Sequence, residues 1–167
     1  MWRSPKVRLN RLAKSKSPHA RGNTSAQSLR RARGKSSTHF IPLALARKFE
    51  ALAAQRGVSK VARGEKKSRV SDGGFFQAAK RANGRKERLS QMPIRRGAAQ
   101  TWWQRRNAFC ARHRAQQAIQ KDAPLESRGK YKGTPTRREL GMIMWMCSSL
   151  TPAQLRKTLP AVKRAVE

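Results

Sequence analysis

The sequence predicts a mostly α-helical protein, with a small helical C-terminal module that follows a long basic, irregular N-terminal extension and basic linkers. Three observations lead to this prediction. Lys and Arg number 40 against 8 Asp and Glu, and residues 1–40 contain no acidic residue. Only 37% of the residues are hydrophobic, which limits the size of a core. Apolar residues recur at helical spacing only after residue 41, most densely in the last third of the chain.

We divide the chain into four parts on this basis. Residues 1–40 form a basic extension, whose Arg- and Ser-rich, acid-free composition is also typical of a mitochondrial targeting segment. A helix follows over 41–57, then a basic linker with a short helix over 58–97, and finally the helical module over 98–167.

The first helix is predicted over residues 42–56. Pro42 stands near its start, Gly57 stands at its stop, and Leu45 and Phe49 fall on one face. The linker then offers a helix over about 75–90, which Gly84 weakens.

The longest helix is predicted over 98–121, because this stretch contains no Gly or Pro. Two further helices follow. Thr136 and Glu139 form a capping-box pattern before the apolar run "LGMIMWMC", which we expect to be the buried centre of the fold; a buried strand is the alternative. Thr151 and Pro152 start the last helix, which Pro160 should kink or split.

The sequence shows no recognisable catalytic motif. Cys110 and Cys147 give no disulfide framework and fit a reducing compartment or plain burial. Cys110 and His113 have C-x-x-H spacing and are weak zinc candidates, which Cys147 and His39 could complete, although a core cysteine and a surface histidine explain them better. We therefore expect no enzyme, no metal, no cofactor and no small-molecule substrate, and no run is long enough for a membrane span.

Trp102 and Trp103 are adjacent on the predicted long helix and point about 100° apart. One could pack inward while the other stacks on an unpaired base or meets a partner protein; the simpler alternative is that both close a small core.

The strongest signal is the formal net charge of +32. Charge runs are usually solvated faces, but an excess this large, spread over the whole chain, favours contacts with a phosphate polymer. The expected RNA-binding residues are Arg30, Arg31, Arg33, Lys35, Lys66, Lys67, Arg69, Lys80, Arg81, Arg85, Lys86, Arg88, Arg95, Arg96, Arg105, Arg106, Arg128, Lys130 and Lys132.

Acid-free, Arg-rich arms, short helices and a Met- and Trp-rich apolar element together resemble a mitochondrial ribosomal protein, and the opening "MWRSPKVRLNRLAKSK" resembles a mitochondrial targeting segment. This resemblance is one of character and carries no family motif. It implies a structural protein of the mitochondrial matrix that binds rRNA and neighbouring ribosomal proteins. The alternatives are a ribosome-assembly or RNA-processing factor and a histone-like DNA-compacting protein.

Overall fold

The computed structural model describes residues 38–65 and 74–167, and this part of the chain is mostly helical, as predicted. Most of the basic extension 1–40 lies outside the described residues, so the mitochondrial location inferred from it stays a prediction. The elements in chain order are β1 (His39–Phe40), α2 (Leu43–Arg47), α3 (Glu50–Gln55), α4 (Phe75–Arg81), α5 (Lys86–Gln91), α6 (Trp102–Gln120), α7 (Arg137–Met144), β2 (Cys147–Ser148) and α8 (Pro152–Val166).

The helix predicted over 42–56 is divided into α2 and α3. The amides of Lys48 and Phe49 donate to carbonyls three residues back, at 3.1 Å each, and this tighter turn separates the two helices. The tighter turn lies beside Phe49, which is fully buried.

The helix predicted over 75–90 is likewise two helices, α4 and α5. Between these two helices, Asn83 and Gly84 have positive φ angles of 52° and 69°. A Cβ atom on Gly84 would lie 2.9 Å from the Cβ of Leu43, so this corner needs glycine both for its backbone conformation and for its close approach to α2.

The long helix α6 begins at Trp102, four residues later than predicted. The Trp102 amide donates to the carbonyl of Met92 at 2.9 Å, which closes the intervening residues into a loop. Thr101 then caps the helix in a reciprocal capping box with Gln104.

Most of the apolar run "LGMIMWMC" is buried, as predicted, and it changes from helix to strand within its length. Helix α7 ends at Met144, and β2 pairs antiparallel with β1 in the register Phe40 to Cys147. The predicted capping box is only half formed: Thr136 accepts a hydrogen bond from the Glu139 amide at 3.3 Å, whereas the Glu139 carboxylate is used elsewhere.

The last helix, α8, starts with Thr151 as its cap and Pro152 in its first turn, as predicted. It continues through Pro160 to Val166, so the predicted split does not occur.

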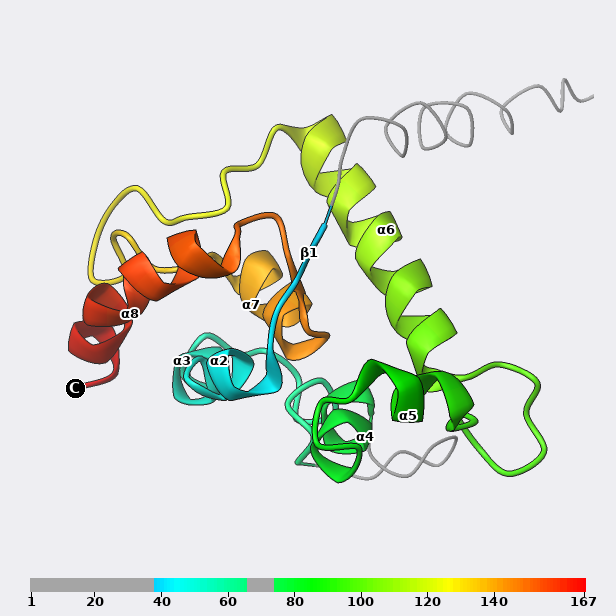
Figure 1. Cartoon of the computed structure of the whole chain (residues 1–167). Coiled ribbons are helices and arrows are strands. Elements are labelled where there is room, and N and C mark those ends of the chain that lie inside the picture. The colour runs from blue at the N-terminus through cyan, green and yellow to red at the C-terminus, as the bar shows by residue number, and fades with distance from the viewer. Residues whose placement is uncertain (1–37, 66–73) are drawn as a thin grey trace, which may run out of the picture.

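Side chains from α2, α3, α4, α5, α7 and α8, together with Trp102 of α6, form one hydrophobic cluster. Phe75, Phe76 and Leu89, which come from the predicted linker, are fully buried in it. In Figure 1 helix α6 runs along one side of the molecule, and β1 passes between α6 and α7. No helix in residues 38–65 or 74–167 is long and apolar enough to cross a membrane.

Candidate functional site

A disulfide bond joins Cys110 of α6 to Cys147 of β2. The Cα atoms are 6.3 Å apart, and the two cysteines are 1% and 0% exposed. Neither residue is the free thiol that the sequence suggested. The proposed zinc ligand set also fails, because its two cysteines are bonded to each other, and the described part of the chain holds no cluster of three metal-binding side chains.

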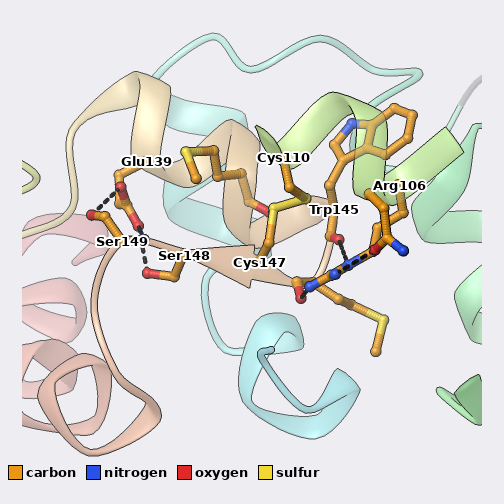
Figure 2. The surroundings of a disulfide bond; sticks show 10 residues. Arg106, Cys110, Glu139, Trp145, Cys147, Ser148 and Ser149 are labelled. Atoms are coloured by element: carbon orange, nitrogen blue, oxygen red, sulfur yellow. Dashed lines mark hydrogen bonds between the residues drawn. A yellow bond between two sulfur atoms is a disulfide. The ribbon is translucent and has the colours of Figure 1, made fainter. Parts of the chain in front are cut away.

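The backbone just before Cys147 is held by a buried arginine. Arg106, one helical turn before Cys110, donates from Nη2 to the carbonyl of Met146 at 2.7 Å and from Nε to that of Trp145 at 3.3 Å (Figure 2). Its guanidinium lies 4.7 Å from the Trp103 ring centroid. Burial lowers the pKa of Arg106 to about 10, so this side chain remains a cation at neutral pH.

Met146 adopts the left-handed conformation, with φ at 53°, which is uncommon for a residue with a side chain. Its carbonyl accepts from the Ile41 amide at 3.0 Å as well as from Arg106. These two donors hold the turn that carries the chain from α7 into β2 and places Cys147 opposite Cys110.

The backbone just after Cys147 is held by a buried carboxylate. Glu139 accepts from the hydroxyl of Ser148, from the amide and hydroxyl of Ser149 at 2.8 Å each, and from the Gln117 side chain at 3.4 Å. Figure 2 shows Cys147 between Glu139 on one side and Arg106 on the other. The position of Cys147 is therefore fixed from both directions along the chain.

Aromatic rings line this region. Trp145 stacks between Phe75 and Phe109, with centroid distances of 5.2 and 4.2 Å, and Phe109 also contacts the His113 ring at 4.1 Å. Trp145 and Phe109 are half-buried and pack against the cluster of Cys110, Met142 and Cys147. They are the partly exposed side chains that cover the disulfide.

The tryptophans of the predicted pair have different roles. Trp102 is 2% exposed and packs in the core against Phe75, whereas Trp103 is half-buried beside Phe40. Trp102 therefore packs inward, and contact of the half-buried Trp103 with a base or a partner protein stays a prediction.

The predicted RNA-binding residues lie on several separate elements. Arg106 is buried in the disulfide site, and Lys80 forms an ion pair with Glu50 at 3.0 Å. The exposed members are Arg81, Arg85, Lys86, Arg88, Arg95, Arg96, Arg128, Lys130 and Lys132, while Arg105 is half-buried. Arg30, Arg31, Arg33, Lys35, Lys66, Lys67 and Arg69 lie outside the described residues.

Residues 40–164 match the sequence profile of the family described as Mimivirus sulfhydryl oxidase R596-like, C-terminal domain. The chain belongs to this family. The match spans well over half of the 167 residues and includes both cysteines. No curated protein matches the sequence.

Membership in the R596-like family contradicts the ribosomal interpretation. The prediction of a mitochondrial ribosomal protein with a structural, rRNA-binding role is wrong. The predictions that the chain is not an enzyme and that its partners are rRNA and ribosomal proteins are wrong as well. The assembly-factor and DNA-compacting alternatives rested on the same charge argument and are withdrawn with them. A large positive charge describes composition alone and does not distinguish a ribosomal arm from the solvated surface of another basic domain.

The signal that the sequence analysis missed is the cysteine pair. The chain contains two cysteines, 37 residues apart, one at the middle of a long helix and one after a buried apolar run. Both positions predict burial, and two buried cysteines in a small core could have been considered as a pair. Their pairing depends on the crossing of α6 and β2, which spacing alone does not reveal.

Proposed function

We propose that this chain acts in thiol oxidation, with the Cys110–Cys147 disulfide as its two-electron oxidant. The observation that carries the proposal is this disulfide, within a domain whose family is named for a sulfhydryl oxidase.

The proposed reaction is thiol–disulfide exchange. A substrate thiolate attacks one sulfur of the disulfide, forms a mixed disulfide and releases the other cysteine as a thiolate. A second substrate thiol then attacks the mixed disulfide. The products are a substrate disulfide and the dithiol form of Cys110 and Cys147, which together have gained two electrons and two protons. Exchange with a more oxidising protein disulfide, which accepts those electrons, returns the pair to its starting state.

Arg106 supports this chemistry as a positioning residue. It lies one turn before Cys110 and binds the carbonyl of Met146, the neighbour of Cys147. We expect this buried cation, which is hydrogen-bonded to the backbone next to Cys147, to favour the thiolate that leaves during exchange. Among the described residues no carboxylate forms an ion pair with Arg106, so its charge is not neutralised locally.

Access to the sulfur atoms requires movement, because both cysteines are buried. Trp145 and Phe109 cover the disulfide and are partly exposed, so we expect their displacement to admit a thiol.

Burial favours a second candidate role, a structural crosslink between α6 and β2. Structural disulfides have reduction potentials below about −300 mV and resist the glutathione pool, whereas redox-active ones lie higher. The reduction potential therefore separates the two roles.

The test is a redox titration of the full chain in defined mixtures of oxidised and reduced dithiothreitol, with free thiols trapped by alkylation and counted by mass. A midpoint above about −300 mV, with one thiol pair oxidised per chain, supports the exchange role. The Cys110→Ser, Cys147→Ser double variant is the control, because the sequence has no other cysteine. A midpoint below that value indicates the crosslink and rejects the proposal.

A further inference from the structure

A hollow of about 490 Å³ lies between α6, α7 and residues 58–59. Its size is that of a pocket for a small ligand. The two helices contribute Phe109, His113, Gln116, Arg137, Arg138 and Gly141 to its lining.

The lining is cationic and contains no acidic side chain. Arg137 is exposed and donates to the carbonyl of Gly57 at 3.0 Å, and its guanidinium carries further N–H donors. Arg138 is half-buried and pairs with Asp122, which fixes it at the edge of the hollow. Burial, together with the neighbouring Arg112 and Arg138, lowers the pKa of His113, so its ring is neutral at pH 7 and offers one donor and one acceptor.

The apolar lining of the hollow includes a side chain that also covers the disulfide. Phe109 lines the hollow and also packs against the cluster of Cys110, Met142 and Cys147. A ligand in the hollow therefore lies next to one of the side chains that cover the sulfur atoms.

Gly141 leaves space on the α7 side of the hollow. A Cβ atom built there would meet no atom within 4 Å, and Gly141 has ordinary helical geometry. A larger side chain at this position would point into open space and would not collide with the core.

We propose that this hollow binds the carboxylate of an acidic thiol peptide, through Arg137 with Gln116 and His113, and that such peptides are the substrates of the disulfide. The thiol half of this inference rests on the proposed function, whereas the carboxylate half does not. An Arg guanidinium recognises a carboxylate by paired hydrogen bonds, and the apolar face of Phe109 suits the carbon chain that joins carboxylate to thiol.

Binding is tested with S-methylglutathione, which has two carboxylates but no reactive thiol. We expect Arg137→Gln to weaken its binding about ten- to a hundredfold by calorimetry, the effect of one charge-assisted hydrogen bond. Gly141→Leu should also weaken binding, by filling the hollow. Arg156→Gln on α8 removes the same charge from an exposed site outside the hollow and should bind as the wild type does.

Two outcomes of this experiment would overturn the proposal. In the first, Arg137→Gln and Arg156→Gln bind equally well. In the second, inorganic phosphate displaces S-methylglutathione at an equal concentration, which would indicate a general anion site. Circular dichroism of each variant shows whether it has folded.

Exchange kinetics then separate the two halves of the inference. Arg137→Gln should slow the reaction of the disulfide with glutathione and leave its reaction with the uncharged thiol 2-mercaptoethanol unchanged. An equal effect on both thiols contradicts substrate selection by the hollow. A disulfide that reacts with neither thiol, in a protein that still binds S-methylglutathione through Arg137, rejects the proposed function and leaves the carboxylate site standing.

Discussion

Arg106 is a buried cation whose hydrogen-bond partners are carbonyl oxygens and the Asn107 side chain. Removing such a side chain leaves buried acceptors without a donor, which costs more than the hydrogen bonds add in net stability. The Trp145 carbonyl would lose its side-chain donor, and Met146 would hold its left-handed turn with the Ile41 amide alone.

We therefore expect Arg106→Met to lower the free energy of unfolding by about 1–3 kcal/mol in urea titrations. Arg105→Met is the matched control, because it removes the same group from the neighbouring half-buried position on α6. Equal losses for the two variants would contradict the role assigned to Arg106.

His113 makes stability depend on pH. Its pKa is lowered in the folded chain, so the unfolded chain takes up the proton first as the pH falls through about 6.5. Folding stability is therefore lost from about pH 6.5 down to the lower folded pKa. We expect the fall in Tm between pH 7.5 and pH 5 to be smaller in His113→Gln than in the wild type. An identical fall in both proteins would show that His113 contributes nothing.

The disulfide connects the long helix α6 to the two-stranded sheet. It closes a loop with a sequence separation of 37. In the chain-entropy description a loop of this length contributes about 4 kcal/mol, because it restricts the unfolded chain.

The Cys110→Ala, Cys147→Ala double variant should accordingly lose about 4 kcal/mol of unfolding free energy. Reduction of the wild type with a strong reductant should produce a similar loss, since it removes the same crosslink. The reductant should not change the unfolding free energy of the double variant. A decrease in the variant would show that the reductant lowers stability by a route other than breaking the disulfide.

Helix α8 carries an internal proline. Pro160 lacks the amide that would donate to the carbonyl of Arg156, and it is exposed, so its ring adds little packing. Pro160→Ala should therefore stabilise the protein by about 1–3 kcal/mol and raise Tm. Pro152→Ala is the comparison, because proline suits the first helical position, and it should give no gain. A loss of stability in Pro160→Ala would contradict this account.

The whole molecule carries a formal net charge of +32, because 40 Lys and Arg stand against 8 Asp and Glu. Ion pairs such as those of Glu126, Glu50 and Asp122 can therefore neutralise only a small part of the positive charge. Charge of one sign repels itself across the folded surface, and salt screens that repulsion. Screening by dissolved salt requires no polyanionic partner. The basic composition is therefore compatible with membership in the R596-like family.

Tm should therefore rise between about 0.05 M and 0.5 M sodium chloride. Choline chloride at the same concentrations should give the same rise, because screening does not depend on the identity of the cation. A constant or falling Tm would show that repulsion does not limit stability.

Local chemistry made part of this protein predictable from its sequence. The N-cap residues Thr136 and Thr151 and the burial of most of residues 140–147 depend on neighbours in the chain, and these predictions are confirmed, although the capping box at Thr136 is only half formed. At Gly84 a helix gives way to a tight turn where the sequence predicted one helix, because the close approach of this corner to Leu43 depends on the fold.

The sequence by itself determined a basic, mostly helical chain whose apolar third is buried, because composition and periodicity act over short distances. Only the tertiary structure decided that Cys110 and Cys147 form a bond, that Arg106 and Glu139 hold the backbone on either side of Cys147, and that a cationic hollow lies next to them. Cys110 lies 37 positions before Cys147, and Arg106 lies 40 positions before Met146, so only the crossing of α6 with α7 and β2 brings them together.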